Sequence, residues 1–154
     1  MSLLEAPLPV TTDSGQSRRI DLLVAKGRVG DKILDNLSLI MNTNLTRAPR
    51  NKGAGNTRNY QKLLSDLSAT VWIIEAKKST WRTTMAVGQL LLYSNIVADR
   101  YPKLRIAGWG ILLPESLPEE SRALLQTIMI QARAGFCSKR NLLETGIGLR
   151  IFSG

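Results

Sequence analysis

The hydrophobic residues of this chain gather in short, nearly continuous runs separated by longer stretches of mixed character. Runs of this length, bounded by glycine, proline or charged residues, are typical of buried strands. We expect strands at 18–25, 70–76, 104–113 and 146–152. At the N-terminus, residues 1–17 are polar and rich in turn formers, so at most a short strand is expected at 8–12.

The stretches between these runs predict helices. Ser79 or Thr80 can cap a helix that ends near Arg100, before Pro102. Pro118, followed by two glutamates, begins a second helix that we expect to reach about residue 134. A short helix is expected at 60–67, whereas 31–41 could be a helix or a strand. Strands that alternate with long helices predict a single α/β domain with helices flanking the sheet.

The composition excludes several chemistries. The chain of 154 residues contains no histidine and one cysteine, Cys137. It therefore has no Ser-His-Asp or Cys-His nucleophile, no histidine-ligated metal and no internal disulfide. No apolar run is long enough to cross a bilayer and no secretory signal is evident, so we expect a cytoplasmic protein without membrane partners. Any catalysis must use carboxylates, lysines and a cation that prefers oxygen ligands.

The charge is strongly positive and unevenly distributed. Lys and Arg number 21 against 12 Asp and Glu, a formal net charge of +9. The stretch 43–59 reads as a loop or insertion that contains no acid and four basic residues, Arg47, Arg50, Lys52 and Arg58. Such a cluster favours a nucleic-acid partner, with the loop following phosphates. The alternative is a solvated, disordered insertion with no binding role.

Charged residues also follow the most hydrophobic strand, V-W-I-I-E-A-K-K at 71–78. Side chains alternate across a strand, so Glu75 and Lys77 share one face while Ile74 and Ala76 take the other. Asp21 lies among apolar neighbours in the strand at 18–25, where an unpaired carboxylate is costly. Two carboxylates that share a Mg²⁺ or Mn²⁺ ion, with a lysine beside them, would form a site for phosphodiester hydrolysis.

The order of these residues resembles the PD-(D/E)XK, or restriction-endonuclease-like, nuclease superfamily. The resemblance rests on R-I-D-L-L-V around Asp21 and on I-I-E-A-K ending in Lys77. The helix that follows carries Gly88-Gln89-Leu90-Leu91-Leu92-Tyr93, which is similar to the RecB-like Gln-x-x-x-Tyr element. The resemblance covers about 18–113. The chain differs from the family in the long segment between Asp21 and Glu75, which makes 30–69 an insertion or an extra subdomain. It also has Ile20 where the family usually has proline.

The resemblance implies a central mixed β-sheet flanked by helices and a Mg²⁺-dependent deoxyribonuclease, expected to be an endonuclease. Asp21 and Glu75 would be the metal ligands and Lys77 the catalytic lysine. Gln89 and Tyr93, on one helix face, would support the site or contact the substrate, and Lys78 would contact phosphate. DNA is the expected substrate, with RNA as a second possibility. A homodimer or higher homo-oligomer is implied by the resemblance alone.

Less specific interpretations remain open for each part of this set. Glu75 and Lys77 could form an ion pair at a strand end, and Asp21 could be a buried acid bonded to Arg18 or Arg19 or to backbone amides. The main functional rival is a nucleic-acid-binding module that keeps the same fold without cleaving. A basic adaptor for another protein is a more distant possibility.

The basic cluster leads to a first prediction. Replacing Arg47, Arg50, Lys52 and Arg58 together should weaken DNA binding independently of sequence, because fewer counterions are released. The slope of log affinity against log salt concentration should fall by about 0.9 for each duplex phosphate that the variant no longer neutralises. Binding isotherms at several salt concentrations measure it. An unchanged slope would mean that the stretch is only an insertion.

Overall fold

The fold is known from a computed structural model that describes residues 2–11, 17–25, 46–47, 62, 64–66, 68–79 and 82–153. The prediction for 31–41 lies outside the described residues, as do Arg50, Lys52 and Arg58. Of the stretch predicted as a basic loop, Thr46–Arg47 forms a two-residue strand, β3, which pairs in parallel with β1. The short helix predicted at 60–67 is helical at its described positions, Lys62 and 64–66.

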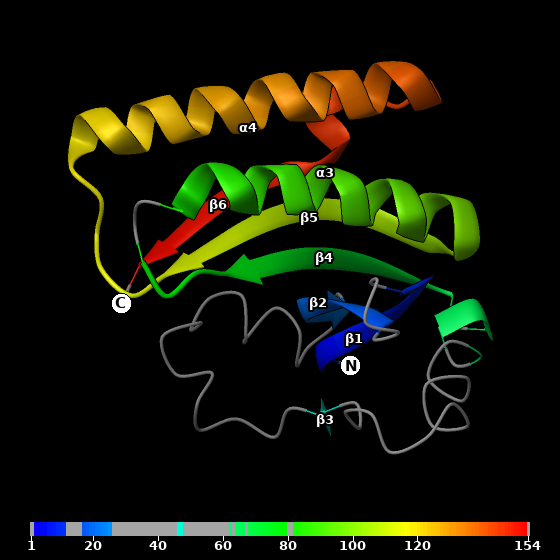
Figure 1. The fold of residues 1–154 in the computed structure, drawn as a ribbon. Helices are drawn as coiled ribbons and strands as arrows, with labels where there is room; N and C mark the ends of the chain where they lie inside the picture. Colours follow the sequence, from blue (N-terminus) through cyan, green and yellow to red (C-terminus); the bar gives the residue numbers. More distant parts are fainter. Residues whose placement is uncertain are drawn as a thin grey trace.

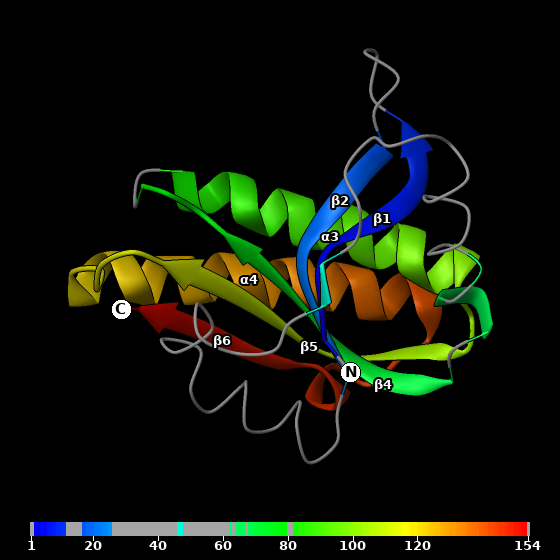
Figure 2. The same cartoon turned by 90° about the horizontal axis from the view of Figure 1, so that it is seen from below.

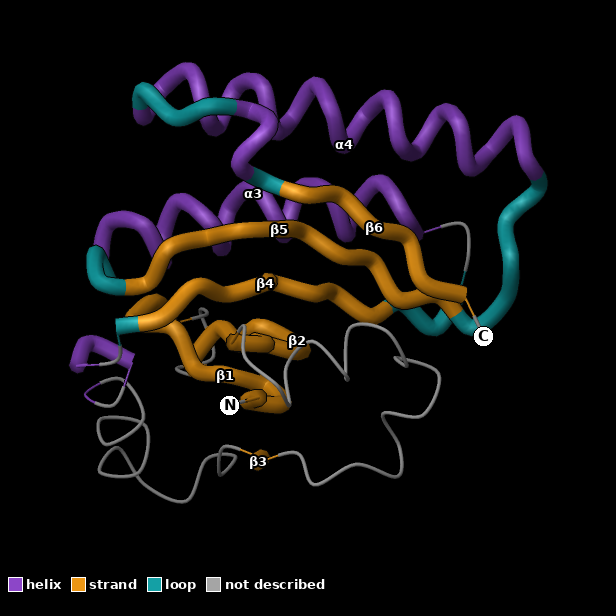
Figure 3. Tube along the Cα trace, turned by 180° about the vertical axis from the view of Figure 1, so that it is seen from behind, coloured by secondary structure: helices purple, strands orange, loops and turns teal. Residues whose placement is uncertain are grey.

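One sheet organises the described part of the chain, in the order β3-β1-β2-β4-β5-β6 (Figure 3). β2 pairs antiparallel with both β1 and β4, whereas β4, β5 and β6 are parallel to one another. The sheet is therefore mixed, and the predicted α/β fold with a mixed sheet and flanking helices is confirmed. Besides β3, its strands are β1 Ser2–Thr11, β2 Ser17–Ala25, β4 Ala69–Ala76, β5 Leu104–Leu113 and β6 Gly148–Ser153.

Two long helices lie side by side on the same face of the sheet (Figure 1). α3, Thr83–Arg100, connects β4 to β5, and α4, Glu119–Arg140, leads through the short 3-10 helix η3, Glu144–Gly146, to β6. A helix that connects two neighbouring strands in this way allows the two strands to run parallel. No helix in the described part of the chain is long and apolar enough to cross a membrane.

The N-terminal strand is longer than the sequence indicated. Residues 1–17 were expected to contain at most a short strand, but β1 covers ten residues and pairs with β2 along its length. Pairing with a partner strand, rather than local propensity, determines this element. Pro7 and Pro9 are tolerated because β3 pairs only with Leu3 and Leu4, which leaves the later part of β1 with β2 as its described neighbour.

The helix ends also differ from the predicted ones. α3 begins at Thr83 rather than after Ser79 or Thr80, and no side-chain hydrogen bond caps it. α4 continues past the predicted end to Arg140, where Asn141 closes it in the left-handed conformation with φ 55°. Arg140 donates hydrogen bonds to Asp99 Oδ1 at 2.9 Å and to Asn95 Oδ1 at 2.8 Å, so contact with α3 stabilises the additional turns.

Alternation along β4 divides the core between the two faces of the sheet. Val71 and Ile73 pack under the helices, whereas Trp72 and Ile74 belong to a smaller cluster on the opposite face. The Trp72 ring lies against Gly108 of β5, where an added Cβ would overlap it, and also against Gly148 of β6. The two glycines therefore allow the indole to lie across three strands.

This packing gives a prediction about stability. Gly108→Ala should lower the free energy of unfolding by about 1–3 kcal/mol, because the new methyl group must displace a ring held between strands. Gly135→Ala is the matched control, since Gly135 lies in α4 with open space around it. The control should stabilise the protein by about 0.5–1 kcal/mol through helix propensity. Urea denaturation measures both changes, and equal effects would contradict the proposed packing.

Candidate functional site

The candidate site lies where β2 and β4 stop pairing. Their antiparallel register runs from Ala25↔Val71 to Leu22↔Ile74. Beyond this point the β1–β2 hairpin curves away from β4 (Figure 2). Asp21 and Glu75 are the next residues on the two strands. The structure therefore brings the two predicted acids together, although a long segment separates them in the sequence.

Each acid is bonded to the backbone of the opposite strand. The amide of Ala76 donates to Asp21 Oδ2 at 2.8 Å, and the amide of Asp21 approaches Glu75 Oε1 at 3.4 Å. These contacts extend the connection between β2 and β4 beyond the last regular pair. They also turn the Asp21 carboxylate toward the end of β4, and the bond from the Ala76 amide is the backbone contact that the alternative of a structural buried acid expects for Asp21.

Glu75 is an unusually buried acid, with 1% of its surface exposed. The pKa of Glu75 is raised to about 9, first by burial and then by the negative charge of Asp21 and a hydrogen bond between the two side chains. The attraction of Lys77, which lowers this pKa, is the weakest of these influences. The alternative of a strand-end ion pair between Glu75 and Lys77 therefore does not account for the burial of the carboxyl group.

Lys77 is held in place through both its backbone and its side chain. Its amide donates to Leu112 O at 3.0 Å, so the pairing of β4 with β5 continues one residue past the end of β4. Its ammonium group donates to Gln89 Oε1 on α3. Lys77 consequently points to the helix-covered face, as strand alternation predicted, and Gln89 contacts the site through it.

The other predicted site residues are placed less directly. Tyr93 is 5% exposed and belongs to the core under α3, so its side chain is not presented to a substrate; packing support remains the role compatible with this position. Lys78 is exposed just after Lys77, and its contact with phosphate stays a prediction. Side chains of the basic stretch that begins at Arg47 are not among the described ones.

The pair of acids could hold one cation, because carboxylate oxygens are suitable ligands for Mg²⁺. Among the described residues no group of three or more Asp, Glu, His or Cys side chains could hold a metal. A Mg²⁺ ion would keep several waters, so two carboxylates are a sufficient protein contribution. The amide of Ala76 also belongs to the site. Residue types could not reveal it, because every residue except proline supplies a backbone amide.

Comparison of the chain with known protein families, with curated proteins and with solved structures finds no match.

The pKa of Glu75 leads to a prediction for buffer containing EDTA. Its folded pKa of about 9 exceeds the ordinary value of 4.5, so the folded state holds a proton that the unfolded state has lost between these two values. The contribution of Glu75 to the free energy of unfolding should therefore be greatest below pH 4.5. It should fall as the pH rises toward 9, by up to about 1 kcal/mol per pH unit.

Glu75→Gln should remove this dependence, because an amide cannot ionise, and should be more stable than the wild type at pH 8. Glu115→Gln, which changes an exposed acid, is the control and should leave the profile unchanged. Urea denaturation at several pH values provides the measurement. Parallel profiles for the wild type and Glu75→Gln would show that Glu75 ionises normally.

Proposed function

We propose that this protein is a Mg²⁺- or Mn²⁺-dependent nuclease that hydrolyses DNA phosphodiester bonds on a restriction-endonuclease-like core. The observation that carries the proposal is the buried Glu75 carboxyl group beside Asp21, with Lys77 on the same face of β4. Two neighbouring carboxyl groups of this kind cannot both ionise without a cation between them. Such a pair is therefore expected where a bound cation offsets the repulsion between their negative charges.

The arrangement of strands supports this assignment. In the nuclease superfamily that the sequence resembles, the first acid and the Glu-x-Lys strand are neighbours. Here β2 and β4 are antiparallel neighbours, even though the chain between them is long. The helix that follows the Glu-x-Lys strand packs on the same face and places Gln89 on Lys77.

In this proposal Asp21 and Glu75 hold the cation, which would supply positive charge for the phosphate and make a water molecule more acidic. Lys77 would orient the attacking water or stabilise the developing charge on the phosphate. Gln89 would act as a positioning residue, because its side-chain oxygen fixes the ammonium group. The amide of Ala76 would hold the Asp21 carboxylate in its orientation.

The charge of the chain is consistent with the proposed substrate. A net charge of +9 attracts a polyanion over long range, and contacts with phosphate provide affinity that does not depend on base sequence. Lys78 and Arg82 are exposed in the connection between β4 and α3. In this proposal they would contact phosphates next to the bond that is cut.

The decisive test replaces Lys77. Lys77→Ala should reduce plasmid nicking in Mg²⁺ or Mn²⁺ by about 100-fold or more, since it removes a group that acts on the reacting atoms. Affinity for DNA should be retained, because most phosphate contacts lie elsewhere. Lys103→Ala is the charge-matched control: Lys103 is exposed before β5, at the opposite end of the parallel strands, and its removal should leave nicking unchanged.

Glu75→Ala should also lose cleavage, and EDTA should abolish nicking by the wild type. If the wild type binds DNA but cleaves neither plasmid nor single-stranded DNA with any divalent cation, the protein is a binding module on this fold. If Lys77→Ala nicks as fast as the wild type, the assigned centre is wrong.

A further inference from the structure

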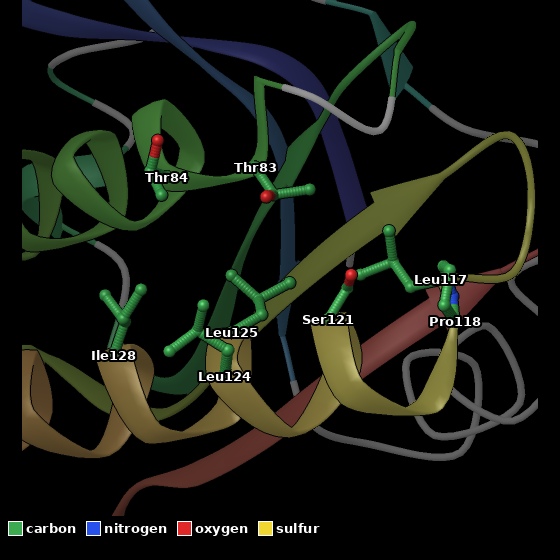
Figure 4. Close-up of a pocket in the computed structure, with 8 residues that line it drawn as sticks. All are labelled: Thr83, Thr84, Leu117, Pro118, Ser121, Leu124, Leu125 and Ile128. Carbon is green, nitrogen blue, oxygen red and sulfur yellow. The ribbon is translucent and has the colours of Figure 1, made fainter.

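A pocket of about 390 Å³ lies between the first turn of α3 and the N-terminal half of α4 (Figure 4). Thr83 and Thr84 of α3 line one side, and α4 with the loop before it lines the other. Both helices begin shortly after the carboxyl ends of β4 and β5, which are paired up to Ala76↔Leu112. The pocket therefore shares one end of the sheet with Glu75 and Lys77, but it lies between the helices rather than between β2 and β4.

The lining of the pocket is apolar with a few hydroxyl groups. Thr83, Thr84 and Ser121 can each donate and accept hydrogen bonds. The apolar surface comes from Leu117, Leu124, Leu125 and Ile128. None of the lining residues is charged, so the pocket does not suit a phosphate group. It suits a neutral group with apolar faces and a polar edge, which is the combination that a nucleobase presents.

We propose that this pocket receives one unstacked nucleobase of the substrate strand; the inference rests on the proposed nuclease function. Thr83 and Gln89 are separated by about 9 Å along the axis of α3. Gln89 contacts Lys77, which marks the position of the cleaved bond in the proposal. At about 3.4 Å per stacked nucleotide, this distance corresponds to about three nucleotides.

A nucleic acid fits the charge of the surroundings better than a second copy of the chain does. Leu124 is 63% exposed at the pocket and could contact another protein surface. A second copy, however, would bring a further charge of +9 toward the first, whereas a nucleic acid brings the opposite charge.

The pocket also defines a class of substrate. A base in a continuous duplex is paired and stacked, so it must leave the helix before it can enter a protein pocket. Single-stranded nucleic acid, or a duplex with an unpaired base near the cut, avoids this cost. The substrate class is therefore a strand with at least one unpaired base within about three nucleotides of the cleaved bond.

The experiment uses single-stranded oligonucleotides in which one abasic position is moved along the sequence. Binding is measured by fluorescence anisotropy in Ca²⁺, and the cleavage position is mapped in Mg²⁺. For the wild type, an abasic position within about three nucleotides of the cut should weaken binding by about fivefold, because the contact between one base and the pocket is lost. Other positions should have little effect.

Ser121→Leu should fill the pocket and remove this position dependence. Ser138→Leu is the matched control, because Ser138 is an exposed serine of the same helix outside the pocket. Thr84→Leu fills the pocket from the side of α3 and provides a second variant if the first does not fold. Circular dichroism checks folding, and light scattering measures the molecular mass of each variant.

The possible failures are distinguishable. If the wild type binds and cleaves but no abasic position matters, the pocket does not receive a base and the proposed function stands. If binding depends on one abasic position but nothing is cleaved, the pocket is supported and the nuclease proposal fails. If the filled variants keep the position dependence and instead change the molecular mass, the pocket is a contact between copies. If the chain neither binds nor cleaves, both proposals fail.

Discussion

The close approach of two carboxyl groups, one of them almost fully buried, is the constraint on which the rest of this site depends. A buried charge beside a like charge is unstable, so Glu75 must either keep a proton or share a cation with Asp21. The protein places this pair where β2 and β4 separate, and the amide of Ala76 there satisfies the Asp21 carboxylate. A fold that only needed stable pairing of β2 with β4 could have used apolar residues at both positions, so stability alone gives no reason for the pair.

Lys77 and Gln89 reach the two acids because β4 is followed by a short connection and then by α3. β4 ends at Ala76, but the bond from Lys77 to Leu112 keeps the backbone extended for one more residue. The side chain of Lys77 therefore still follows strand alternation and points under α3. Because α3 runs back over the sheet, Gln89 in its second turn meets this lysine. The acids come from two antiparallel strands, and the lysine and its partner come from the crossover that follows.

The sequence could predict the elements whose signal is local, and it could not predict those that depend on a partner. The strand at 104–113 was predicted with its observed bounds, because a long apolar run lies between Pro102 and Pro114. β1 was largely missed, since its residues form a strand by pairing with β2. The Gln-x-x-x-Tyr spacing places Gln89 and Tyr93 on one helix face. It cannot tell which of them reaches the site and which is buried, because that depends on how α3 sits on the sheet.

The far edge of the sheet limits how copies of this chain could associate. Among the described strands β6 pairs only with β5, and an open edge of this kind could accept a strand from another molecule. Arg122 of α4, however, donates to Ile151 O of β6 at 3.4 Å, and Arg133 of α4 donates to Ile147 O, just before β6, at 2.8 Å. Carbonyl groups engaged in this way are less available to an incoming strand. If the chain forms the homo-oligomer that its resemblance to nucleases implies, the contact is therefore expected on a surface other than the β6 edge.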